Sequence, residues 1–140
     1  MSTETNKATV RRYVEQVMGA GRANLIDEFM VESIALHGTG LEPGLPALGQ
    51  WVAMLDSAFP DRQLTVDDVV AEGDRVVARV TMRGTHQGEM QGIPATGKAI
   101  NQSSITIFRL ANGKIAEGWF AADNLSLMQQ LGVIPALQAA

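Results

Sequence analysis

Residues 99–122, AINQSSITIFRLANGKIAEGWFAA, decide the fold class of this chain. Two runs rich in β-branched and aromatic residues flank Asn112-Gly113, and both residues of this dipeptide tolerate the positive φ of a tight turn. The stretch therefore predicts a hairpin with antiparallel strands over residues 99–111 and 114–122.

The period of the apolar residues changes between the two halves of the chain. Apolar residues recur at helical spacing before Pro60, whereas residues 75–85 alternate strictly, as a strand with one buried face does. The predicted strands cover residues 33–37, 64–70, 75–85, 99–111 and 114–122, and the predicted helices cover residues 2–20, 24–30, a segment between Pro43 and Pro60, and 123–131. Helices first and hairpins afterwards predict an α+β domain, in which a strongly curved antiparallel or mixed sheet wraps the N-terminal helices and leaves a cavity at its wide end.

Composition limits the classes of protein that the chain can represent. Its 140 residues predict a single domain over residues 1–140. A net charge of −4 argues against nucleic acid as the main partner, and the absence of cysteine with only two histidines argues against a metal site or a bound cofactor. No apolar run reaches the ~18 residues of a membrane span, and the polar start lacks a signal peptide, so we expect no membrane partner and a cytoplasmic protein.

The two-residue turn also predicts a register, in which Ala111 lies opposite Lys114 and each outward step pairs the next two residues. One face of the hairpin then carries polar and aromatic side chains together: Gln102, Ser104, Thr106, Phe108, Glu117, Trp119, Ala121 and Asp123. The other face carries Ile105, Ile107, Arg109, Gly118 and Phe120. The mixed face is either a solvated surface or a pocket wall, and Trp119 favours the pocket because a solvated tryptophan leaves a large apolar area in water.

Asp123 ends the last predicted strand, directly before a helical segment. It is either the N-cap of that helix or a carboxylate at the pocket, where apolar walls would raise its pKa and make it a base for a proton α to a carbonyl. Glu117 is either a second pocket carboxylate or the partner of a nearby arginine.

The two histidines and the aromatic residues of the third helix are weaker candidates. His37 points either into the pocket or out from an edge strand, and His86, beside a loop, is expected at the surface. Trp51 and Phe59 have helical spacing and are most simply core residues.

Several segments together resemble the SnoaL-like polyketide cyclases, a branch of the nuclear transport factor two superfamily. The segments are residues 58–61 (AFPD), 72–77 (EGDRVV), 84–88 (GTHQG), 92–98 (GIPATGK), 113–117 (GKIAE) and 129–132 (QQLG), together with Trp119 and Asp123. The resemblance implies a cone-shaped α+β fold, a homodimer packed through the sheet, and cofactor-free chemistry on a hydrophobic polyketide-like ester. It assigns to Asp123 the acid–base role in an intramolecular aldol closure.

The chain departs from this family pattern at two places. Gly118 stands before the tryptophan, where histidine is frequent, and the predicted partner strand offers Gln102, Ser104 and Thr106 where the characterised cyclases have a pocket histidine. Both departures bear on catalysis and neither bears on the fold.

Two functions are therefore compatible with the sequence. In the first, Asp123 takes a proton, Gln102 or a hydroxyl stabilises the enolate oxygen, and an apolar pocket holds a small hydrophobic substrate; the pocket candidates are His37, Trp51, Met54, Phe59, His86, Gln102, Ser104, Thr106, Glu117 and Trp119. In the second, the same pocket binds a ligand without turnover, or the domain only dimerises. In either case we expect a homodimer that buries the apolar face with Ile105, Ile107 and Phe120.

Overall fold

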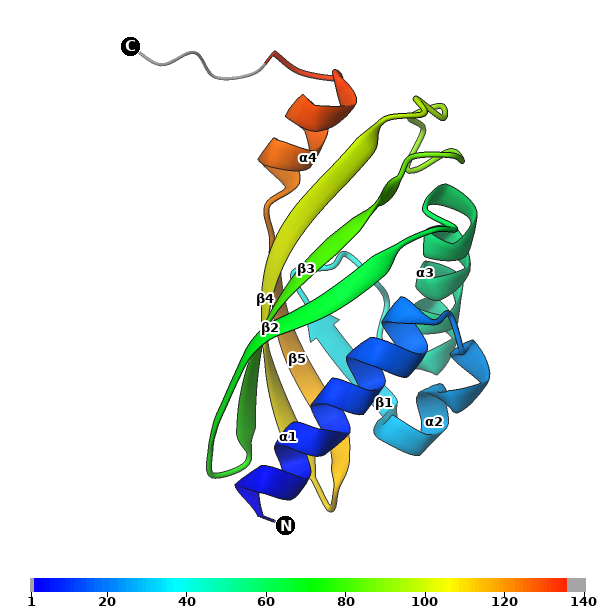
Figure 1. Ribbon diagram of the computed structural model, residues 1–140. Coiled ribbons are helices and arrows are strands. Elements are labelled where there is room, and N and C mark those ends of the chain that lie inside the picture. Colours follow the sequence, from blue (N-terminus) through cyan, green and yellow to red (C-terminus); the bar gives the residue numbers. More distant parts are fainter. Residues whose placement is uncertain (1, 136–140) are drawn as a thin grey trace.

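The computed structural model describes residues 2–135 (Figure 1). Its elements are, in chain order, α1 (Thr3–Arg12), η1 (Tyr13–Gly19), η2 (Ala23–Leu25), α2 (Ile26–Phe29), β1 (Met30–His37), α3 (Leu45–Ala58), β2 (Gln63–Glu72), β3 (Arg75–Thr85), β4 (Ala99–Ala111), β5 (Lys114–Ala122) and α4 (Asn124–Leu131). The α+β class predicted from the sequence is confirmed.

The five strands form one mixed sheet in the order β1-β5-β4-β3-β2. β1 pairs with β5 in parallel, and every other neighbouring pair is antiparallel. The sheet is strongly bent, with α1, η1, α2 and α3 on its concave side (Figure 1). The start of α1 lies at the end of the sheet that carries the hairpin turns, and α4 lies at the opposite end.

The first helix differs from the prediction in its second half. It begins at the N-cap Ser2, whose side chain accepts a hydrogen bond from Thr5 N at 3.1 Å, and it continues beyond Arg12 as a π-helix. Ala20 N donates to Glu15 O at 2.9 Å, which is the i→i+5 pattern of a π-helix. The wider turn matters because it changes the sequence spacing of the side chains that share one face of the helix.

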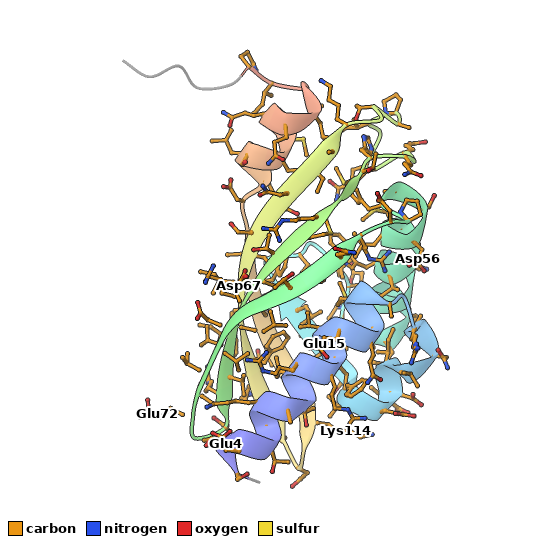
Figure 2. The ribbon with its side chains drawn as sticks, viewed as in Figure 1. Glu4, Glu15, Asp56, Asp67, Glu72 and Lys114 are labelled. Atoms are coloured by element: carbon orange, nitrogen blue, oxygen red, sulfur yellow. The ribbon has the colours of Figure 1, made fainter. Side chains whose placement is uncertain are left out.

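Apolar side chains fill two adjoining regions of the core. The first lies between the N-terminal helices and the middle of the sheet and includes Val10, Val17, Val52, Val76 and Ile115. The second lies toward α4 and includes Leu55, Phe59, Met90, Leu127 and Leu131. The charged residues labelled in Figure 2 are exposed and lie at the periphery: Glu4, Glu15, Asp56, Asp67, Glu72 and Lys114.

The β4–β5 hairpin has the predicted turn but not the predicted register. Asn112 and Gly113 have positive φ, and Ala111 pairs with Lys114. A β-bulge at Ala116 then inserts one extra residue into β5, so that Arg109 lies opposite Glu117. Because neighbouring side chains of a strand point to opposite faces, every β5 residue after the bulge faces the side opposite to the one we predicted.

Candidate functional site

Two adjoining cavities lie between the helices and the concave face of the sheet. The first, here called the central chamber, has a volume of about 80 Å³ and lies between η1, α3 and strands β3 to β5. The second, the α4-side chamber, has a volume of about 190 Å³ and is closed by the C-terminal half of α3 and by α4. Both chambers are lined by Thr39, Trp51 and Phe120, so the two spaces adjoin at these side chains.

Six of the predicted pocket residues line these chambers. Ser104 and Thr106 line the central chamber, Trp51 lines both, and Met54, Phe59 and Gln102 line the α4-side chamber. Ser104 and Thr106 reach the cavity because alternate residues of β4 face inward. Their role in substrate binding stays a prediction.

Three predicted pocket residues lie instead on the convex face, outside the cavity. His37 Nε2 lies 2.7 Å from Glu117 Oε2, and Arg109 Nε donates to Glu117 Oε1 at 3.2 Å. The Trp119 ring stacks on His37, with ring centroids 5.5 Å apart, and the Arg75 guanidinium lies 4.9 Å above the same ring. The bulge is the reason: it turns Glu117 and Trp119 outward and brings Phe120, predicted on the outer face, into the cavity wall.

On the convex face, His37 and Arg109 both stabilise the ionised carboxylate of Glu117. The hydrogen bond from His37 holds the pKa of Glu117 below its ordinary value, and Arg109 acts in the same direction. Of the two alternatives for Glu117, the structure shows the arginine pair.

His86, which we expected at the surface, is fully buried. Its Nδ1 accepts a hydrogen bond from Thr96 N at 3.2 Å and lies 3.0 Å from Thr96 Oγ1, and its ring lies 5.5 Å from that of Phe59. The surface prediction was wrong because the loop after β3 folds back over α3, where Gln87 N donates to Ala58 O at 2.9 Å. His86 does not line either chamber.

Asp123 is the N-cap of α4. Its Oδ1 accepts a hydrogen bond from Ser126 N at 3.0 Å, and the residue is exposed. The predicted projection of Asp123 into the pocket was wrong, because the bulge turns Ala122 inward. The residues on either side, Ala122 and Asn124, both line the α4-side chamber.

The polar groups of the cavity are few and uncharged. None of the described residues that line the two chambers is Asp, Glu, His, Lys or Arg. In the α4-side chamber, Gln102 Nε2 donates to Asn124 Oδ1 at 3.0 Å. The described part of the chain has no group of three or more His, Asp and Glu side chains placed to hold a metal ion.

Sequence reasoning missed three of the lining residues that matter for chemistry, namely Tyr13, Phe120 and Asn124. A tyrosine within the apolar stripe of the first helix was the available signal for Tyr13, since a buried phenol hydroxyl usually needs a partner. For Phe120 the available signal was indirect. A register without a bulge places the carboxylate of Glu117 opposite Phe108 on the buried face, and a register shift that turns Glu117 outward also turns Phe120 inward.

Comparison with known proteins agrees with this architecture. The model of the SnoaL-like polyketide cyclase family matches residues 8–131. The chain belongs to the SnoaL-like polyketide cyclase family. It is 30% identical over 137 residues to the aklanonic acid methyl ester cyclase DnrD of Streptomyces peucetius, covering 94% of this chain and 92% of that protein. It is 25% identical over 116 residues to the nogalonic acid methyl ester cyclase of Streptomyces nogalater, covering 80% of this chain and 87% of the relative.

Solved structures show the same fold. The chain superposes on TsrD of Streptomyces laurentii with a TM-score of 0.88 at 28% identity, covering 96% of this chain and 99% of that one. A SnoaL-like polyketide cyclase of Agrobacterium tumefaciens superposes with a TM-score of 0.77 at 17% identity over 94% of this chain and all of the other, which shows the fold alone. The family and its named cyclases make this SnoaL-like chain a polyketide cyclase-like enzyme with a small organic substrate. Within residues 2–135, no helix is long and apolar enough to span a bilayer.

Proposed function

We propose that this SnoaL-like chain performs cofactor-free acid–base chemistry on a small hydrophobic polyketide-like carbonyl compound, as an aldol-type cyclisation or an isomerisation. The observation that carries the proposal is the cavity itself. It is lined mainly by apolar side chains, and Gln102 and Asn124 supply a hydrogen-bonded amide pair beside Asp123. Enclosed apolar sites with a few convergent polar groups are typical of small-molecule sites.

Asp123 is the group that we propose as the base. Its neighbours in the chain line the α4-side chamber, and the hydrogen bond from Ser126 N holds its carboxylate at the start of α4. Giving up an N-cap costs about 1 kcal/mol, which is small beside the several kcal/mol that a general base contributes to a reaction. A substrate that extends past Asn124 would therefore meet a carboxylate that turns toward it at modest cost.

The test uses two substitutions of Asp123 that separate a cap from a base. Asn caps a helix about as well as Asp but cannot accept the proton, so Asp123→Asn should leave the melting temperature unchanged and lower turnover about 10²- to 10⁴-fold. Asp123→Ala should lower turnover equally and also lower the melting temperature. Aklanonic acid methyl ester, the compound named for the DnrD relative, is the first substrate to assay, with product formation followed chromatographically.

Ser2→Ala is the matched control for the loss of a cap. Ser2 caps α1 far from the cavity, so its replacement by Ala should cost about 1 kcal/mol of stability and no turnover. Full activity of Asp123→Asn would rule out the base assignment.

A binding module without turnover is the second candidate function. It is favoured by the absence of any carboxylate or histidine from the described lining of both chambers. Binding of the same ester without conversion, at equal affinity in the natural chain and in Asp123→Asn, would select this function.

We also propose that the protein is a homodimer that buries the convex face of the sheet. Ile105 and Ile107 are 49% and 38% exposed there, beside the half-buried Trp119. Phe120, which the sequence predicts on this face, lies in the cavity wall and is not part of the proposed interface. Light scattering should return twice the chain mass, and Ile107→Asp should halve it; a monomer of about 15 kDa for the natural chain would refute the interface.

A further inference from the structure

Besides that of Thr39, three hydroxyl groups belong to residues on the otherwise apolar wall of the central chamber. They belong to Tyr13, which is 3% exposed, to the buried Thr106 and to the half-buried Ser104. Within residues 2–135, the Tyr13 hydroxyl makes no hydrogen bond, and burial alone raises its pKa. The phenol therefore stays protonated at neutral pH and can donate.

A hydroxyl that lines an apolar cavity without a protein partner is available to hydrogen-bond a bound molecule, and it gains most where that molecule displaces water. Thr39, on the same wall, carries a hydroxyl that does have protein partners. Thr39 Oγ1 donates to Leu36 O at 2.6 Å and accepts from Leu41 N at 3.1 Å, so that hydroxyl is satisfied within its own loop. The chamber thus combines one satisfied hydroxyl with others that are open to a bound molecule.

Two different elements bring these hydroxyls together. Tyr13 begins the π-helix, and its ring packs edge-on against Phe108 with centroids 5.9 Å apart. Ser104 and Thr106 are alternate residues of β4 and share the inward face with Phe108. Tyr13 directly follows α1, and the π-turn after it brings Met18 to the same chamber wall as Tyr13 and Val14.

We propose that the central chamber is an anchoring subsite that holds an uncharged carbonyl oxygen of the substrate through Tyr13, Ser104 and Thr106. The inference rests on the proposed function and assigns these residues a positioning role, because the proposed base lies beside the other chamber. No cationic side chain lines the central chamber within the described chain, so a carboxylate would be desolvated there without a counter-charge. The subsite therefore selects a neutral oxygen. The end of a long substrate that carries an uncharged carbonyl enters the central chamber.

The test compares a ketone with the hydrocarbon of the same shape. 1-Tetralone and tetralin are titrated against the natural chain, Tyr13→Phe and Thr106→Val, with affinities measured by NMR shift changes. Each variant should lose about three- to tenfold affinity for 1-tetralone, the range expected for one neutral hydrogen bond, and none for tetralin. The infrared carbonyl band of bound 1-tetralone should move to higher wavenumber in Tyr13→Phe, as its hydrogen bond is lost.

Two controls separate the subsite from a general effect on packing. Thr65→Val removes an exposed hydroxyl from β2 and should change neither affinity. Tyr13→Phe removes no protein hydrogen bond among the described residues, so its melting temperature should not fall.

The possible outcomes are distinct. If tetralin and 1-tetralone lose affinity equally in Tyr13→Phe, or if 1-tetralone loses none in either variant, the anchoring subsite is wrong while the proposed function stands. If neither compound binds the natural chain, the small-molecule cavity fails, and the proposed function fails with it.

Discussion

Replacing Gly38 by alanine should destabilise the protein far more than the same change at Gly40, two residues later in the loop after β1. Both glycines have positive φ, of 86° and 76°. A Cβ at Gly38 would lie 2.2 Å from the carbonyl oxygen of Phe120, whereas a Cβ at Gly40 would meet no atom within 4 Å. Gly40→Ala is therefore a matched control that carries the backbone cost without the collision.

The magnitudes follow from these two contributions. An alanine held at positive φ costs about 1 kcal/mol. At ~2.1 cal/mol/K per residue, the 140 residues have an unfolding entropy near ~0.3 kcal/mol/K, so Gly40→Ala should lower the melting temperature by about 3 °C. At Gly38 the clash is with backbone, which cannot turn aside as a side chain does, and a total of about 3 kcal/mol or about 10 °C is expected.

The assay is thermal unfolding of both variants, followed by circular dichroism. Phe120 lines both chambers, so a Gly38→Ala collision that displaces its backbone should also weaken 1-tetralone binding, and Gly40→Ala should not. Equal melting temperatures for the two variants would refute the contact between the loop and β5.

Two other substitutions test the electrostatics of the fold. The pKa of Glu117 is lowered in the folded state, chiefly by its hydrogen bond with His37, so its contribution to stability is present above its ordinary pKa of about 4.5 and is lost as the pH falls through the lowered value. Glu117→Gln should therefore flatten the dependence of stability on pH in that acid range. An unchanged pH dependence would contradict the pairing of Glu117 with His37. The buried Arg62 donates through Nε to Met18 O at 2.7 Å, and its Nη2 lies 2.7 Å from Asp56 Oδ1 in an ion pair without straight hydrogen-bond geometry. Arg62→Met should cost about 3 kcal/mol of stability, whereas Asp56→Asn, which changes a half-exposed carboxylate, should cost less than about 1 kcal/mol. Both losses are measured by urea unfolding. Equal losses would refute the inference that the hydrogen bond of Arg62 to Met18 O contributes more than its ion pair with Asp56.

The sequence by itself determined the elements whose signals are local. The bounds of β3, β4 and β5 agree with the prediction because strict alternation and the Asn112-Gly113 turn depend only on neighbouring residues. The same holds for the end of α3 before Pro60 and for the cap role of Asp123, one of the two alternatives that its position allowed.

The tertiary structure decided which side chains enter the cavity. One extra residue, Ala116, reverses the faces of β5, and a bulge of this kind has no strong local signature in a run of small and apolar residues. What favours it is burial: it turns Glu117 toward His37 and Arg109 and brings Phe120 against Thr106. That choice depends on residues far apart in the chain.

His86 and Tyr13 show the same limit. His86 is buried because its loop returns over α3, and Tyr13 lines the central chamber because the first helix packs that side against β3 to β5. Local periodicity predicts that a residue is buried or exposed on average. Which cavity a buried polar group faces is decided by packing between elements, since only packing supplies or withholds the hydrogen-bond partner.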